Sequence, residues 1–349
     1  MLPGNFCNTS MEQSSDTEMW YSVCSKDSVG FLVYYLGFLF TITVINVIGN
    51  ILVISTFVRH PKLQQPCNYF ITSLAVSDLF AGIVYTLYNL AHLESIGLRE
   101  SLGGWTVCSL LLWVVQGFQF SSAYHLVGIT VSRYIMVTSP LCAERYLTAP
   151  RVALSLVVIW TVSNFVSAGL YIAFTPQDNY PSVCRYELIY TMWHIYGTMI
   201  YAVVLPFLIM MGLYFRIASI AKKQAKLITA LENIQTAREV NTRKSSTLRE
   251  SKSTRMIATL LGCFFLGWMP FILYVIVKLG CSTCVISKYI RATSRLFLHM
   301  NSAVNIFIYA GRLSEFRSAL RKDLSKIRLW PATMGPCVRV SPEVETRSG

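Results

Sequence analysis

Residues 131–141, VSRYIMVTSPL, end one of the longest apolar stretches in this chain of 349 residues. They place a basic residue, Arg133, where nonpolar side chains give way to polar ones, and the residue before it is Ser132 instead of an acid. About 20 consecutive apolar residues span the hydrocarbon core of a bilayer. The stretch that ends here, 106–137, is longer, so it predicts a membrane-spanning helix that tilts or projects from the bilayer.

The same apolar pattern recurs along the chain and predicts an all-α membrane protein. Hydrophobic residues make up 54% of the sequence and charged residues 13%, too little charge to cover the surface of a soluble protein of this length. We expect a seven-transmembrane helix bundle. Its spans are 30–58, 68–93, 106–137, 152–174, 190–217, 255–279 and 289–310.

The net charge of +13 is concentrated in the segments that follow the first, third, fifth and seventh spans. These segments lie on one side of the membrane if the spans alternate, and the positive-inside rule makes that side the cytoplasm. The N-terminal tail, residues 1–29, is then expected to be extracellular, with Asn8 in a glycosylation sequon and no cleavable signal peptide. A basic surface can also bind nucleic acid. Here we interpret the charge as topology and attraction to anionic membrane lipids, with no nucleic acid partner.

One carboxylate, Asp78, lies deep in the second predicted span. Such a group costs a few kcal/mol in a membrane, so it faces the bundle interior and marks a functional site. Its expected partners are Asn50 in the first span and Asn301, Ser302 and Asn305 in the seventh. Together they would form a polar cage for a sodium ion or a proton, and the alternative is a purely structural aspartate.

Several polar, aromatic and proline positions occur along the spans at characteristic spacings. They are Gly49-Asn50, Leu74-Ala75-x-x-Asp78, Cys108, Ser132-Arg133-Tyr134, Trp160, Pro206 with Tyr214, Phe264-x-x-x-Trp268-x-Pro270, and Asn305-x-x-x-Tyr309. In these positions the chain resembles the rhodopsin-like (class A) G protein-coupled receptors, over about residues 30 to 328. The two prolines are expected to interrupt the fifth and sixth spans. The chain departs from the family at Ser132, where an acid is usual, and at Ile306, where proline is usual.

The resemblance implies a plasma-membrane receptor that binds an extracellular small-molecule ligand and activates a heterotrimeric G protein. It divides the chain into the extracellular tail, a receptor domain at 30–311, an amphipathic helix at 312–328 along the inner leaflet, and a cytoplasmic tail at 329–349. Arrestin and receptor kinases are further partners that it implies. The histidines are scattered and no nucleophile and base pattern is visible, so the sequence does not indicate an enzyme.

Arg133 lacks the adjacent acid of the family, and the resemblance implies another acidic partner. Glu250, twenty residues before Pro270, occupies the place where family members often hold this arginine in the resting state. In the active state the sixth span would swing outward and open a cleft for the terminal helix of a G protein. The alternative is that Glu250 is one more charge in a mixed run. The residues assigned to activation and coupling are Arg133, Tyr134, Tyr214, Glu250, Phe264, Asn305 and Tyr309.

Six of the ten cysteines fall on the predicted extracellular side, where thiols oxidise. These are Cys7, Cys24, Cys108, Cys184, Cys281 and Cys284. Cys281 and Cys284 are expected to close a small ring. The resemblance implies a second disulfide, from Cys108 to Cys184 in the second outer loop, and the sequence leaves open whether the remaining two pair.

The pocket on the outer side is expected to bind a small polar or anionic molecule. Biogenic-amine receptors need an aspartate seven residues after the Cys108 position, and here that residue is Val115. Arg291 and Arg295 share one helical face of the seventh span, and arginine binds carboxylate or phosphate bidentately. Two further basic residues, Lys278 and Lys288, are expected to be solvated at the rim.

Among subfamilies the chain most resembles adenosine receptors, through Cys184-Arg185-Tyr186-Glu187 and Cys281-x-x-Cys284. In those receptors the loop aromatic stacks on a purine and the acid contacts its amine, so a nucleoside-like ligand is one form of the expectation. Val275 and Leu39 depart from that pattern, and adenosine itself is not predicted. The predicted ligand-binding residues are Gln116, Gln119, Tyr186, Glu187, Trp268, Phe271, Arg291, Arg295 and His299.

Other classes of protein also have seven spans. A retinal protein needs a lysine in the seventh span for its Schiff base, and that position is His299. A transporter would show internal repeats or discontinuous helices, and the sequence shows neither. Within the receptor class, Ser132 makes a constitutively signalling orphan receptor an alternative to a ligand-activated one.

Overall fold

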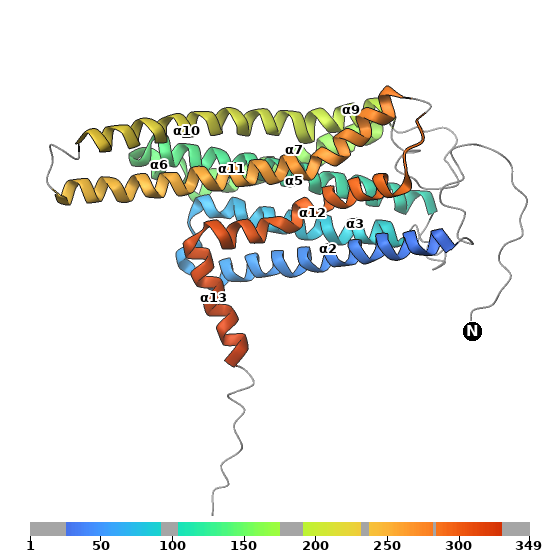
Figure 1. Cartoon of the computed structure of the whole chain (residues 1–349), viewed down its shortest axis with the longest axis horizontal. Coiled ribbons are helices and arrows are strands. Elements are labelled where there is room, and N and C mark those ends of the chain that lie inside the picture. The colour runs from blue at the N-terminus through green and yellow to red at the C-terminus, as the bar shows by residue number, and fades with distance from the viewer. Residues whose placement is uncertain (1–25, 92–103, 175–190, 232–236, 282–283, 330–349) are drawn as a thin grey trace, which may run out of the picture.

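The structure is a computed structural model that describes residues 26–91, 104–174, 191–231, 237–281 and 284–329. Six long helices are α2 (Lys26–Arg59), α3 (Tyr69–Ala91), α5 (Gly104–Thr138), α7 (Ala149–Phe174), α11 (Ala237–Gly280) and α12 (Lys288–Arg312). A seventh long unit consists of α9 (Met192–Met199), the π-helical turn η4 (Ile200–Val204) and α10 (Leu205–Leu231). The seven units pack side by side as a bundle (Figure 1), which confirms the predicted fold class.

Short helices lie at one end of the bundle. The turns η1 (Pro61–Leu63) and η2 (Pro66–Asn68) join α2 to α3, and α6 (Pro140–Tyr146) joins α5 to α7. Each begins with a proline, whose missing N–H costs no hydrogen bond in a first helical turn. Helix α13 (Ser314–Leu329) follows α12 and turns away from the bundle axis (Figure 1). We call this end, where Arg133 lies, the Arg133 end, and the opposite end the pocket end.

The helices differ in which face they bury. Five of the seven units are long and apolar enough to cross a membrane by length and composition, within the described residues. The other two, α5 and α12, carry polar side chains that are buried, among them Gln116, His125, His299 and Asn305. By contrast, the buried residues of α7 are Val152, Ser163 and Ser167, and its exposed side chains are largely apolar. Apolar side chains therefore face the lipid and polar ones face the bundle interior.

Helices α10 and α11 extend beyond the predicted spans, since α10 ends at Leu231 and not at 217, and α11 continues through Pro270, where an interruption was expected. Helix α11 begins at Ala237, well before the predicted start at 255, because hydropathy detects the membrane segment and not the polar helix that continues beyond it. The predicted break at Pro206 takes the form of the π-helical turn η4, which ends two residues earlier. Such a turn locally widens the helix. The clash of the proline ring with the preceding turn is thereby relieved, and α10 continues through Pro206.

Two glycines allow helices to approach closely. A methyl group built on Gly49 of α2 would lie 2.8 Å from Cγ2 of Ile306 on α12. One built on Gly82 of α3 would overlap the side-chain amide of Asn46 on α2. These contacts bring α2 against both α3 and α12 around the buried Asp78.

Candidate ligand pocket and polar core

The carboxylate of Asp78 is fully buried at the centre of the bundle and is bonded on both oxygens. Ser122 Oγ of α5 donates to Oδ1 at 2.8 Å, and Asn305 Nδ2 of α12 donates to Oδ2 at 2.6 Å. Ser302 is a further hydrogen-bonding neighbour of this carboxylate. The polar core therefore ties α3 to α5 and to α12.

The predicted asparagines have different places in this core. Asn305 is a direct partner of Asp78, whereas Asn50 donates to the side-chain and backbone oxygens of Asn46. Asn46 in turn donates from Nδ2 to the backbone oxygen of Asp78 at 2.9 Å. Asn301 lies against Gly267 of α11. Sequence reasoning missed Asn46, although its position one helical turn before Asn50 was a usable signal.

The donor set of the core fits a small hard cation better than a transition metal. Carboxylate, hydroxyl and amide oxygens are the ligands that hard cations prefer. Among the described residues, the Oδ1 atom of Asn50 and the hydroxyl of Tyr309 are buried without a hydrogen-bond partner. The described residues contain no group of three or more histidine, cysteine or acidic side chains that could hold a metal ion. The residues present are therefore compatible with sodium.

A pocket that is partly open to solvent lies at the pocket end between α3, α5, α9, α11 and α12, and its empty space, open solvent included, is about 620 Å³. Its apolar lining is Leu112, Val115, Trp268, Phe271 and Leu298. Its polar lining is Tyr85, Tyr88, Gln116, Gln119, Thr198 and Arg295. An apolar lining with a few polar groups is typical of small-molecule sites.

Aromatic rings of α11 connect the pocket with the bundle interior. Trp268 lies 6.5 Å from Phe271 on the pocket side and 6.2 Å from Phe264 on the other side, measured between ring centroids. Phe271 is followed by Tyr274 at 6.1 Å. The three rings of Phe264, Trp268 and Phe271 are buried, and a ligand against Phe271 and Trp268 would contact the pocket side of this packed aromatic row.

Five predicted ligand-binding residues line this pocket, and two others lie elsewhere. Gln116, Gln119, Trp268, Phe271 and Arg295 are in the lining. His299 lies behind it, with its ring 4.8 Å from that of Tyr85 and its Nε2 atom 3.3 Å from Thr43 Oγ1. Arg291 is half-buried and outside the lining.

The rim lysines differ from one another. Lys278 is exposed, as expected. Lys288 is not simply a solvated charge, because its Nζ atom lies 5.2 Å from the ring centroid of Phe31 and 5.8 Å from that of Tyr289. These are cation–π distances, so Lys288 fastens the start of α12 against α2.

A buried polar cluster lies behind the α5 wall of the pocket. Gln116 Nε2 is 2.6 Å from Thr198 Oγ1 and 3.0 Å from His194 Nε2. The other ring nitrogen of His194, Nδ1, is 3.1 Å from the backbone oxygen of Leu170. Sequence reasoning missed His194 and Thr198 because they lie in a largely apolar span, and nothing in that span predicts which helix it faces.

At the Arg133 end, the guanidinium of Arg133 meets a neutral partner. Its Nη2 atom donates to Asn68 Oδ1 of η2 at 3.3 Å, and Nη1 lies 3.8 Å from Met136 Sδ. Ser132 is buried and donates to the backbone oxygen of Ile129. The sequence did not indicate Asn68.

The other predicted coupling residues pack near this end. Tyr134 and Tyr214 pack against a small cluster formed by Val137, Ile217 and Ile257. Tyr309 is fully buried, and its ring lies 6.4 Å from that of Phe316 on α13. The tyrosines thus connect α5, α10 and α12 to their neighbours.

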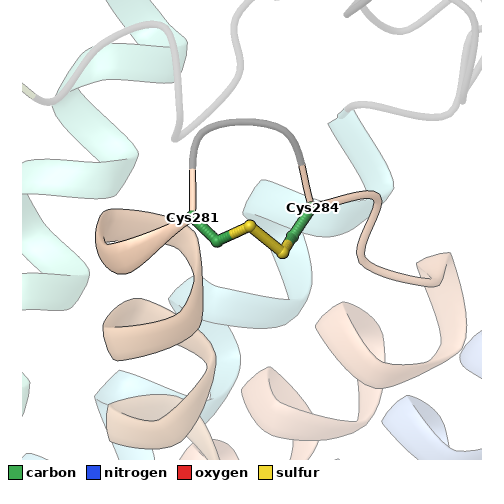
Figure 2. Close-up of a disulfide and its surroundings, with 2 residues drawn as sticks. All are labelled: Cys281 and Cys284. Atoms are coloured by element: carbon green, nitrogen blue, oxygen red, sulfur yellow. A yellow bond between two sulfur atoms is a disulfide. The ribbon is translucent and has the colours of Figure 1, made fainter.

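Several predicted site residues, or their side chains, are not among those that the structure describes. Asn8, Cys184, Tyr186 and Glu187 are outside the described residues, and the side chains of Cys108 and Glu250 are not described. The disulfide between Cys281 and Cys284 is present, with the sulfur atoms 1.97 Å apart, and it joins the end of α11 to the segment before α12 (Figure 2).

A bundle of seven membrane-length units with a polar core, a pocket at one end and an arginine near the other defines a seven-transmembrane receptor. Residues 49–309 match the family described as 7 transmembrane receptor (rhodopsin family), and the chain belongs to this family. It is therefore a multi-pass membrane receptor and not an enzyme.

The receptors that are similar to this chain are named for different small molecules. The chain is 28% identical over 326 residues to "Octopamine receptor beta-1R" of Drosophila melanogaster, covering 84% of this chain and 61% of that receptor. It is 27% identical over 311 residues to "Histamine H2 receptor" of Rattus norvegicus, covering 86% and 81%. It is also 27% identical over 311 residues to "Adenosine receptor A2a" of Equus caballus, covering 84% and 73%. The chain thus resembles amine and adenosine receptors to a similar degree.

Proposed function

We propose that this receptor binds a small polar or anionic molecule in the pocket and activates a heterotrimeric G protein at the Arg133 end. The observation that carries the proposal is the composition of α5. This one helix bears Gln116 in the pocket, Ser122 on the polar core and Arg133 at the far end. Gln116 and Arg133 are separated by about 26 Å along an α-helix axis, so a displacement of α5 at the pocket is transmitted across the bundle.

The pocket chemistry favours a polar or anionic ligand over a cationic amine. The relatives named for octopamine and histamine are amine receptors by name. In this chain Val115 occupies the position of the amine-binding aspartate, and it lines the pocket without a charge. Arg295 lines the same pocket and can pair with a carboxylate or phosphate. A nucleoside-like ligand is a second form of the proposal, supported by the relative named for adenosine.

The two ends would communicate through a two-state bundle. The aromatic row of Phe264, Trp268 and Phe271 and the bonds around Asp78 hold the helices in one arrangement. A ligand shifts such an equilibrium only by its differential affinity for the two arrangements. Sodium bound at Asp78 would favour the arrangement in which the core is closed.

The membrane orientation belongs to the same proposal. Basic residues gather in the connections and helix ends at the Arg133 end, including Lys62, Arg145, Arg151 and Lys222. The positive-inside rule therefore supports a cytoplasmic Arg133 end and an extracellular pocket. Membrane lipids, arrestin and receptor kinases would be further partners at the cytoplasmic side.

A second-messenger panel in cells expressing the chain tests the proposal. Candidate carboxylates, phosphates, nucleosides and amines are applied to the unaltered receptor, to Arg133→Ala and to Arg295→Ala at matched surface levels. We expect an acidic or nucleoside-like compound to produce a response that Arg133→Ala abolishes. A response to amines alone would contradict the ligand class, and responses insensitive to Arg133→Ala would contradict the coupling site.

The alternative of a receptor with high output in the absence of ligand rests on Ser132. Ser132 stands where the family usually has an acid, and its hydroxyl donates to the backbone oxygen of Ile129, so it gives Arg133 no negatively charged neighbour in the chain. The same panel distinguishes the two functions, because ligand-free output would then exceed that of untransfected cells and would be lost in Arg133→Ala.

A further inference from the structure

The buried cluster of Gln116, His194 and Thr198 carries information about the ligand. Gln116 lines the pocket, whereas His194 lies behind it and is fully buried. The relevant atoms are the Nε2 and Oε1 atoms of the Gln116 amide, which lie 3.0 and 3.1 Å from His194 Nε2. Distance alone therefore does not distinguish a donating from an accepting amide.

The backbone oxygen of Leu170 resolves this choice. It lies 3.1 Å from His194 Nδ1, and a carbonyl oxygen can only accept a hydrogen bond. Nδ1 therefore carries a proton. A fully buried imidazolium would be costly inside the membrane, so the ring is neutral and its Nε2 atom has a lone pair.

The lone pair on His194 Nε2 fixes the orientation of the amide. One N–H of Gln116 donates to that lone pair, and the other donates to Thr198 Oγ1 at 2.6 Å. An amide group has two N–H donors, and both are then used. What Gln116 can still offer a ligand is its carbonyl oxygen, which is an acceptor.

We propose that His194 is a positioning residue that makes Gln116 an obligatory hydrogen-bond acceptor, so that the ligand of this pocket must donate an N–H or O–H to the α5 wall. This inference rests on the proposed function, because it specifies the ligand of the same pocket. It adds a second requirement to the pairing of an acidic group with Arg295. The expected ligand class is a small aromatic or heterocyclic acid with a separate hydrogen-bond donor.

The tautomer of His194 is the part of the inference that needs no ligand. The full-length receptor is purified with ¹⁵N-labelled histidine, and the His194 signals are assigned by their loss in His194→Phe. We expect a protonated Nδ1 and an unprotonated Nε2. A protonated Nε2, in either a neutral or a charged ring, would overturn the proposal.

The ligand requirement is tested with matched pairs of probes that differ only in a hydrogen-bond donor. The pairs are 4-hydroxybenzoate with 4-methoxybenzoate and indole-3-acetate with 1-methylindole-3-acetate. Binding is measured on the purified receptor by ligand-observed NMR. We expect the donor member of each pair to bind about tenfold more tightly, since one buried hydrogen bond has about this effect on affinity.

Three variants assign the preference to the cluster. Gln116→Met removes the acceptor, and the preference should fall below about threefold. His194→Phe releases the amide, so both members of each pair should bind with similar affinity. Gln119→Met is the matched control, because it removes a neighbouring pocket amide that His194 does not hold, and there the preference should persist.

The outcomes separate this inference from the proposed function. Equal binding within the pairs in the unaltered receptor would overturn the donor requirement, and absence of binding by every probe would overturn the ligand class. Either result would leave the second-messenger panel to decide receptor function. A donor preference in a receptor that fails to signal would refute the proposed function and support the inference.

Discussion

The guanidinium of Arg133 donates to the side-chain oxygen of Asn68 at 3.3 Å, so an amide from η2 faces the arginine that lacks an acid beside it in the chain. Asn68 is held in place because its Nδ2 atom donates to the backbone oxygen of Leu63 at 3.0 Å. The turn η2 therefore supplies a neutral restraint between the connection of α2 with α3 and the end of α5. A neutral partner restrains a cation less strongly than an acid would.

We expect Asn68→Ala to raise ligand-free signalling about fivefold, because a hydrogen bond that contributes about 1 kcal/mol is lost from the resting arrangement. Asn68→Asp should lower it by forming an ion pair with Arg133. The measurement is second-messenger output normalised to surface receptor. If the role of Asn68 were purely structural, both variants would change the output in the same direction. Gln64→Ala, at the end of the neighbouring turn, serves as the control.

We expect Glu250→Ala to raise ligand-free signalling as well, if Glu250 restrains Arg133 in the resting state. A loss of about 1 kcal/mol corresponds to about a fivefold change in the ratio of active to resting receptor. Glu239→Ala changes another acid of α11 and should leave the output unaltered. Unchanged output in Glu250→Ala would identify this residue as a surface charge, and Asn68 would then be the restraint that matters.

Asp78→Asn should abolish the effect of sodium on receptor stability, because it removes the only full negative charge from the bonds to Ser122 and Asn305. The melting temperature of purified receptor is compared in sodium chloride and choline chloride at equal concentration. Sodium at tenfold its dissociation constant would stabilise the unaltered protein by about 1.4 kcal/mol. A sodium effect that persists in Asp78→Asn would place the ion elsewhere, and Ser122→Ala should give an intermediate effect.

Arg295→Ala should weaken the potency of an acidic agonist roughly tenfold to a hundredfold, since a hydrogen bond to a charged group contributes about 1.5–3 kcal/mol. Lys288→Ala is the control, because Lys288 packs against Phe31 at the start of α12 and not in the pocket lining. Equal losses in the two variants would indicate a general effect of positive charge at the pocket end.

Gly49→Ala should destabilise the receptor by about 1–3 kcal/mol, because its new methyl group would lie 2.8 Å from Ile306 Cγ2. The cost should largely disappear in an Ile306→Ala background, which a double-mutant cycle of melting temperatures would measure. Gly37→Ala is the matched control on the same helix, since a methyl group there meets nothing within 4 Å. Additive effects would mean that α2 and α12 separate freely at this point.

Sequence alone predicted the seven-helix fold because a bilayer demands a long apolar run for each span, and each run is visible locally. It also predicted that Asp78 meets Asn305, since a buried charge requires polar partners. Gln116, Gln119 and Arg295, which stand out as polar residues in apolar spans, line one pocket, and their role in ligand binding stays a prediction. Each of these residues can be recognised from the sequence because it is polar and most of its neighbours in the span are apolar.

The residues that sequence reasoning missed depend on how helices are rotated against each other. His194 and Thr198 meet Gln116 only because α9 packs with a particular face toward α5. Asn68 reaches Arg133 because two short helical turns carry it to the end of α5. The placement of His299 behind the pocket has the same origin, since one turn of α12 separates it from Arg295. Rotation and register between helices are set by packing and not by local pattern.

The continuity of α12 has a mechanical consequence. Where the family usually has proline, Ile306 leaves the helix from Lys288 to Arg312 without a proline hinge. Arg295 in the pocket and Tyr309 near α13 are therefore parts of one stiff rod, and they move together. A ligand that rotates α12 at the pocket end would rotate it by a similar angle at the Arg133 end. The close contact between Ile306 and Gly49 would be the point on α2 about which α12 turns.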